Sequence, residues 1–245
     1  MGHQWHVVQR MSQFLTTTQG RDKSCRLIQY IAMLVSSVMK QRLKYKKDGS
    51  KQYEKVLKME KLGSTMLMTR KVLRLGKPAT NLMQMIISIK KLINSQHNKP
   101  QETKFLLITK ALKDFFLMSY YLCDHFVWLS KINIITKEAI AKKVETLGYC
   151  FWLAALIVII GYEVEYLKNT AKLTQGMEWT GDEAQRKKMQ QYYLEIQKCI
   201  IEILRAVFDI PVSLWHINNE WFNTTFVSIL GVITSYIGCM QCWQK

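Results

Sequence analysis

Residues 62–93 separate into two faces when they are coiled as a helix. At about 100° per residue, one sector collects the cations Arg70, Lys71, Arg74 and Lys77. The opposite sector is apolar and contains Met68, Val72, Leu75, Ala79 and Ile86. The pattern therefore predicts an amphipathic helix with one cationic face and one apolar face.

Two settings fit such a helix. It can lie in the headgroup region of an anionic membrane, with its apolar side chains among the acyl chains and its cations at the phosphates. It can also pack its apolar face on the protein's own core and leave the cationic face in water. Periodicity alone favours this second setting, because most amphipathic helices belong to ordinary folded proteins.

The first half of the chain predicts further helices. The whole sequence of 245 residues has only three Pro and eleven Gly, and this low content of helix-breaking residues favours long helices. A helical piece ends at the break of residues 16–20, and a second amphipathic helix follows from Arg21. An aromatic-rich helix is predicted for residues 104–135. Inside the 62–93 segment, Pro78 predicts a kink or restart next to Gly76.

The second half of the chain contains two uncharged apolar runs. The first, residues 146–162, is 17 residues long and close to the minimum for crossing a hydrocarbon core of about 30 Å, so it predicts a transmembrane, re-entrant or buried helix. The second, residues 221–244, has Trp near both ends and predicts a transmembrane helix. Between them, Thr180 and Glu183 fit a capping box that opens a helix, which we expect to end before Pro211.

The charge distribution predicts a topology. The net charge of +17 calls for a polyanionic partner. Residues 1–145 carry 27 Lys or Arg against 9 Asp or Glu, whereas residues 162–220 carry 7 against 9. Because Lys and Arg accumulate on the cytosolic side, we expect residues 1–145 in the cytosol, 146–162 and 221–245 in the membrane with a short cytosolic tail, and 163–220 in the lumen. A nucleic-acid partner is not expected, because it leaves the two uncharged runs unexplained.

Motifs for catalysis or cofactor binding are missing from the sequence. It contains no Gly-rich phosphate loop, nucleophile elbow, H-E-x-x-H or paired catalytic carboxylates, so we expect no enzyme and no cofactor. Asp124 and His125 are adjacent on a helix and do not face each other, which favours a structural role. Cys239 and Cys242 form a C-x-x-C pair with no second pair or nearby His, so metal binding is not expected.

Several segments together resemble one family. The N-terminal signature lies at Thr18 and Gln19, and continues through Gly20, Arg21, Asp22, Lys23, Arg26, Gln29 and Tyr30. Further similar segments are residues 69–77, 120–129, 208–211 and 233–238. In this order they resemble the peroxin-eleven family, peroxisomal membrane proteins that elongate and proliferate peroxisomes. Residues 213–219 depart from the family's usual Gly-containing turn.

The resemblance implies an all-α fold: a helical membrane protein with cytosolic amphipathic helices and one or two transmembrane helices. It implies a place in the membrane of the peroxisome or a related organelle, with both termini cytosolic. The family's membrane-inserting helix maps onto residues 63–89. The implied partners are an anionic phospholipid membrane, further copies of the chain, and a fission machinery of a dynamin-related GTPase with its membrane adaptor. A pore for small metabolites is the alternative role, and it would need oligomers or amphipathic helices to line it.

Overall fold

The chain folds into α-helices, as the sequence predicts. The computed structural model describes residues 2–43, 50–94, 103–175 and 183–243. These residues form eight helices: α1 (Gly2–Thr16), α2 (Thr18–Leu43), α3 (Ser50–Leu73), α4 (Lys77–Ile93), α5 (Lys104–Lys131), α6 (Glu138–Gln175), α7 (Glu183–Ile217) and α8 (Thr224–Trp243). The all-α prediction is therefore confirmed.

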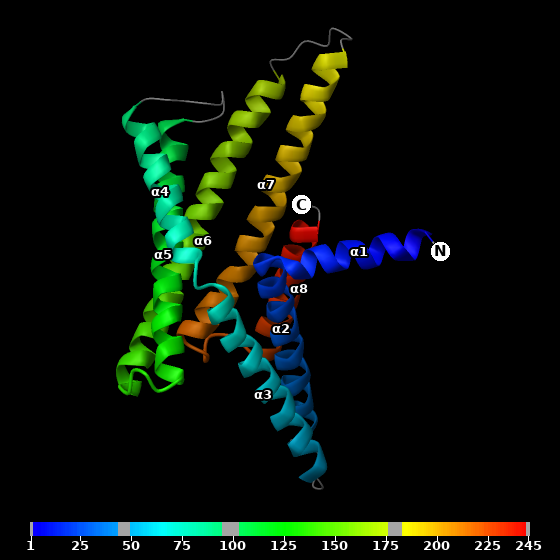
Figure 1. Cartoon of the computed structure of the whole chain (residues 1–245), viewed down its shortest axis with the longest axis vertical. Coiled ribbons are helices and arrows are strands. Elements are labelled where there is room, and N and C mark those ends of the chain that lie inside the picture. Colours follow the sequence, from blue (N-terminus) through cyan, green and yellow to red (C-terminus); the bar gives the residue numbers. More distant parts are fainter. Residues whose placement is uncertain (1, 44–49, 95–102, 176–182, 244–245) are drawn as a thin grey trace.

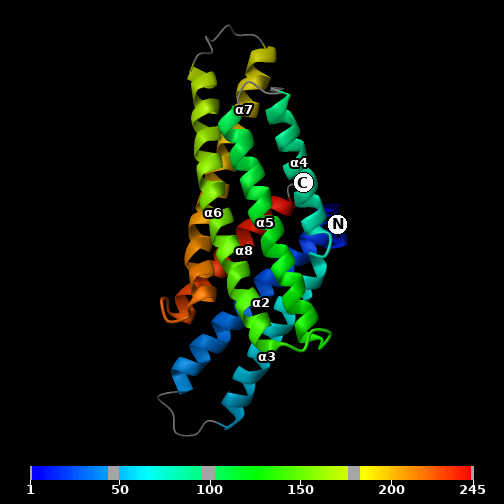
Figure 2. The same ribbon diagram turned by 90° about the vertical axis from the view of Figure 1, so that its left-hand side faces the viewer.

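The helices form an elongated bundle (Figure 1). Each helix packs against the next in the spatial order α3, α2, α8, α7, α6, α5, α4, and α3 also contacts α5. The row of helices thus closes on itself at the α3–α4 junction. The long helices α6 and α7 reach one end of the bundle, while α2 and α3 reach the other (Figure 2). Helix α1 projects sideways and contacts α2 and α8.

Two predicted breaks are present in the structure. Helix α1 ends at Thr16 and α2 begins at Thr18, with a close approach at Gly20. A Cβ at Gly20 would lie 2.0 Å from the carbonyl oxygen of Phe14, so only glycine fits this corner. The segment 62–93 is likewise divided, because α3 ends at Leu73 and α4 begins at Lys77, with a proline in its first turn.

The predicted end of the last long helix before the second apolar run is wrong. Helix α7 continues through Pro211 to Ile217 instead of stopping at residue 210. Asp209, Val212 and Ser213 are buried beside the proline, and their packing holds the helix together where a backbone hydrogen bond is missing. The Thr180 position of the predicted capping box lies outside the described residues.

Two helices are long and apolar enough to cross a membrane. They are α6 over residues 138–174 and α8 over residues 224–243. Helix α6 has 38 residues, so at about 1.5 Å per residue it is about 57 Å long and extends well beyond its 17-residue apolar run. Most residues in the apolar windows of both helices are not buried within the protein. Both predicted spans are therefore present as candidates.

The interior of the bundle is partly polar, and much of its outer surface is apolar. Tyr30, Val212 and Val227 form a small apolar cluster between α2, α7 and α8. Among the described residues, buried polar and charged side chains are as prominent as buried apolar ones, whereas α2, α4, α5, α7 and α8 expose many large apolar side chains. Exposed apolar surface of this extent is typical of proteins that contact lipid or other proteins.

Candidate functional site

Segments far apart in the sequence meet at one buried group of charges. We call this group the buried ion cluster. It has seven members: Asp22 and Arg26 from α2, Arg70 and Lys71 from α3, Arg74 directly after α3, Asp124 from α5, and Asp209 from α7. All seven residues are buried, so each charge depends on partners inside the protein. The cluster lies where α3 ends, at the break before α4.

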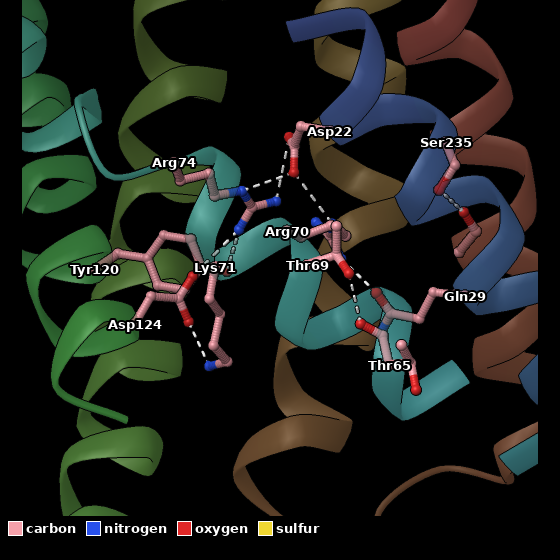
Figure 3. Close-up of polar contacts among 11 residues, drawn as sticks. Asp22, Gln29, Thr65, Thr69, Arg70, Lys71, Arg74, Tyr120, Asp124 and Ser235 are labelled. Atoms are coloured by element: carbon pink, nitrogen blue, oxygen red, sulfur yellow. Dashed lines mark hydrogen bonds and ion pairs between the residues drawn. The ribbon is translucent and has the colours of Figure 1, made fainter. Parts of the chain in front are cut away.

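Arg74 is the centre of the buried ion cluster (Figure 3). Its Nε donates to Oδ1 of Asp22 at 2.9 Å, and its Nη1 donates to Oδ2 of Asp124 at 3.2 Å. The same Nη1 donates to the hydroxyl of Tyr120 at 3.1 Å. One guanidinium group therefore joins α2 to α5, and the backbone that carries it leads directly into α4.

Two further cations at the end of α3, Arg70 and Lys71, add contacts to α2 and to α5. Arg70 donates from Nη1 to Oε1 of Gln29 at 2.6 Å and from Nε to Oδ1 of Asp22 at 3.3 Å, so it binds α2. Lys71 donates from Nζ to Oδ1 of Asp124 at 2.6 Å, so it binds α5. Figure 3 shows the two side chains reaching to opposite sides of α3. The end of α3 is thus fixed between α2 and α5.

Arg26 connects the buried ion cluster to the C-terminal helices. Its Nη2 donates to Oδ1 of Asp209 at 2.5 Å and lies 3.2 Å from the hydroxyl oxygen of Thr234 in α8. One turn away, the ring of Tyr30 packs directly on Gly231, where a Cβ would lie 2.3 Å from a ring carbon. The contacts bring α2, α7 and α8 together with little space between their backbones.

The Asp22 and Asp124 carboxylates of the buried ion cluster are ionised at neutral pH. Burial alone would raise the pKa of Asp22, but the Arg74 and Arg70 guanidinium groups outweigh burial and hold this pKa well below its usual range. Burial likewise opposes ionisation of Asp124, and Lys71 and Arg74 outweigh it and lower the pKa. The cluster is therefore a set of charged pairs and not of neutral hydrogen-bonded groups.

The cations predicted to form an exposed face are mostly inside the protein. Arg70 is 6% exposed, Lys71 1% and Arg74 7%, and Lys77 is half-buried. The structure differs here from the expected arrangement, in which this face meets lipid headgroups or water. The physical reason is that Asp22 and Asp124, from other helices, supply counter-charges within hydrogen-bonding distance. Membrane binding by the segment itself stays a prediction.

The apolar side chains of the same segment face outward. Val72 is 40% exposed, Leu75 50% and Ile86 42%, while Met68 is half-buried. Exposure is most continuous along α4, on residues that we call the apolar face of α4: Leu82, Met83, Ile86, Ile87, Ile89 and Ile93. At about 100° per residue these six side chains fall within a sector of about 160°. The polar residue Ser88, by contrast, is buried.

The residues of the N-terminal signature are mostly part of the interior. Gly20, Asp22, Arg26, Gln29 and Tyr30 are buried, Lys23 is half-buried and Arg21 is exposed. Sequence reasoning missed that Asp22 and Arg26 pair with α3 and α7, since Arg26 and Asp209 are 183 residues apart. One signal was available: the family-like segments contain both the cations and the carboxylates that meet here.

Within the described ranges, no group of three or more His, Cys, Asp or Glu side chains is placed to hold a metal ion. Cys239 and Cys242 are both free thiols and half-buried. What the site offers is a rigid charged interior beside an exposed apolar helix. Such an arrangement can present α4 to an apolar environment while its starting point stays fixed.

Comparison with known proteins identifies the family. The sequence profile described as Peroxisomal biogenesis factor 11 matches residues 8–243. The chain is 23% identical over 251 residues to Peroxisomal membrane protein 11B of Arabidopsis thaliana, covering 98% of both chains. It is 23% identical to Peroxisomal biogenesis factor 11 of Schizosaccharomyces pombe, covering 94% of this chain and 92% of the relative. No solved structure was found to match the chain. Since the profile spans nearly its whole length, the chain belongs to the peroxisomal biogenesis factor 11 family.

Proposed function

We propose that this protein sits in the peroxisomal membrane and elongates it by inserting the apolar face of α4 into the cytosolic leaflet. The observation that carries the proposal is the exposure of six large apolar side chains along one side of α4, from Leu82 to Ile93. The names of the relatives, which call them peroxisomal membrane proteins, support the choice of membrane.

The mechanism follows from asymmetry between the two leaflets. A helix lying at the interface buries its apolar side about 5–10 Å deep in one leaflet and expands that leaflet relative to the other. The expanded leaflet favours a curved or tubular membrane. Lys77 and Lys90 stand at the two ends of α4, where each cation near an anionic surface contributes about 1 kcal/mol to binding.

The buried ion cluster supports this role by fixing the start of α4. Arg74 is held by Asp22 and Asp124, and only three residues separate α3 from α4. A helix whose start is fixed in this way would present its apolar face to the leaflet at a defined orientation. Additional copies of the chain would concentrate such wedges, and the elongated membrane would then be cut by a dynamin-related GTPase recruited through its membrane adaptor.

The test replaces two residues of the apolar face of α4 in the full-length protein. Leu82→Glu with Ile86→Glu places two charges in the proposed lipid contact, so we expect loss of tubules from vesicles that contain anionic phospholipid and loss of elongated peroxisomes in cells without their own copy. Thr80→Glu is the matched control, because Thr80 is exposed on the same helix and already polar. Normal elongation by the double variant would contradict the proposal.

A pore for small metabolites is the second candidate function. It is favoured by one observation, the charged interior: Arg26 and Asp209 are buried beside α8, one of the two candidate spans. The two functions separate experimentally. In planar bilayers, a pore would keep its conductance when Leu82 and Ile86 are replaced by Glu, whereas membrane elongation would be lost.

A further inference from the structure

Two adjoining cavities lie between the helices that meet at the buried ion cluster. The inner cavity has a volume of about 150 Å³ and is lined by Arg26, Arg70 and Arg74 among others. The outer cavity has a volume of about 490 Å³ and lies between α2, α7, α8 and the start of α4. Asp22, Lys23 and Arg205 line both cavities, so they mark the boundary between them.

The lining of these cavities is strongly cationic. Together the two cavities are lined by seven Lys or Arg side chains and three carboxylates. The carboxylates are already engaged: Asp22 with two arginines, Asp209 with Arg26, and Glu202 with Arg205 at 2.6 Å. With Lys23 charged, a surplus of four positive charges is left around the two cavities, which favours binding of an anion.

Lys23 is the cation most in need of a counter-ion. It is half-buried, and within the described part of the chain no ion pair or hydrogen bond joins its ammonium group to another side chain. Burial, together with repulsion from Arg205, lowers the pKa of Lys23 to about 7. Its side chain runs across Gly238 of α8, where a Cβ would lie 3.2 Å from Cδ and 3.7 Å from Nζ. The absence of a side chain at Gly238 leaves room for the ammonium group at the outer cavity.

We propose that Lys23 and Arg205 bind the phosphate group of a ligand at the boundary between the two cavities. A phosphate fits better than a carboxylate because its second negative charge matches the surplus of cations, and because an arginine and a lysine together suit its several oxygens. The outer cavity, which Gln19, Tyr121 and Gln241 also line, has room for the remainder of a phosphate monoester. The phosphate can belong to a soluble ester or to the headgroup of phosphatidic acid.

The surplus of cations predicts how the stability of a Lys23 variant should change with and without phosphate. Lys23→Gln removes a cation from a cation-rich environment, so it relieves repulsion in the ligand-free protein. We therefore expect this variant to be at least as stable as the unchanged protein without phosphate, yet to gain little stability when phosphate is added. A purely structural lysine would behave in the opposite way, because its loss would lower the stability of the ligand-free fold.

The experiment follows thermal unfolding of the full-length protein in detergent while inorganic phosphate is added at constant ionic strength, with chloride as the reference anion. We expect a saturable rise in unfolding temperature that reflects binding to the folded state. Lys23→Gln should weaken the apparent affinity at least tenfold, and Lys23→Arg should retain most of it. Arg21→Gln is the matched control, since Arg21 is exposed on the same helix two residues away and should leave the affinity unchanged.

A second set of unfolding measurements, on the protein in lipid bilayer discs, distinguishes a soluble phosphate ester from a lipid headgroup. Stabilisation by phosphatidic acid over phosphatidylcholine, lost in Lys23→Gln, would assign the site to a lipid headgroup, and stabilisation by inorganic phosphate alone would assign it to a soluble ester. No Lys23-dependent stabilisation in either set of measurements would overturn the proposal. The result is independent of the membrane-bending role, because Leu82→Glu with Ile86→Glu leaves both cavities unchanged.

Discussion

The end of α3 and the whole of α4 adjoin in the sequence but present opposite surfaces. At the end of α3 the cations are buried and in contact with Asp22 and Asp124. In α4 the apolar side chains face outward, while Ser88 is buried and Asn81 half-buried. The difference shows that amphipathic periodicity defines two faces without saying which is inside. Partners from other helices decide that: carboxylates draw the cations at the end of α3 inward, whereas Leu82 and Ile86 each stay 42% exposed in the described structure.

The largest effect is expected from removing the carboxylate that two arginines share. Asp22→Ala leaves Arg70 and Arg74 without this counter-charge inside the protein, so we expect a loss of about 3–5 kcal/mol in the free energy of unfolding. Denaturant unfolding of the full-length protein in detergent measures this loss. Glu60→Ala is the control, because its ion pair with Lys40 is exposed and such pairs contribute about 0–1 kcal/mol. Equal effects of the two changes would mean that the cations of α3 are not held inside.

A smaller effect, with a characteristic pH dependence, is expected at Asp124. Its folded pKa is lowered below the unfolded value of about 3.9, so its contribution is present above that value and is lost as the pH falls through the folded pKa. Asp124→Asn should cost about 2–3 kcal/mol at pH 7, since it weakens the contacts with Lys71 and Arg74. The difference from the unchanged protein should shrink below about pH 4, because the carboxyl is then protonated in the unfolded state and, at still lower pH, in the folded state as well. Unfolding curves from pH 7 to pH 3 would contradict this if the difference stayed constant.

The smallest effect concerns the cations that remain near the surface. Lys90 is exposed in the last turn of α4, and Lys90→Gln should weaken binding to anionic vesicles about fivefold at low salt. Higher salt should reduce the difference, because it screens exposed charges. Arg74→Gln sharpens the comparison: it should lower the stability of the fold, while the protein that remains folded should bind vesicles as before. Weaker vesicle binding by stable, folded Arg74→Gln protein would place that cation at the membrane surface.

Local signals in the sequence predicted most of the helical framework. The corner at Gly20 and the restart at Pro78 follow from backbone chemistry, and the two candidate spans follow from hydropathy alone. Pro211 misled the prediction, because a proline ends a helix only where packing does not hold the flanking turns together. Here Val212 and Ser213 are completely buried, and α7 continues past the proline.

The site was less predictable because its pairs connect distant segments. Arg74 meets Asp22 and Asp124, which lie 52 and 50 residues away in the sequence, and periodicity within one helix carries no information on such pairs. For the same reason, the sequence did not determine whether Ile86 points outward or toward the interior. Asp124, for which a structural role was expected, pairs with Lys71.

The most direct test of the central claim measures the depth of α4 in the bilayer. Single spin labels are attached at residues 80, 82 and 86 of full-length protein without its native cysteines, reconstituted in anionic vesicles. The account predicts that labels at Leu82 and Ile86 are reached by oxygen and shielded from a water-soluble nickel chelate, while the label at Thr80 is reached by the chelate. Equal exposure of all three labels to the chelate would contradict insertion of the apolar face of α4.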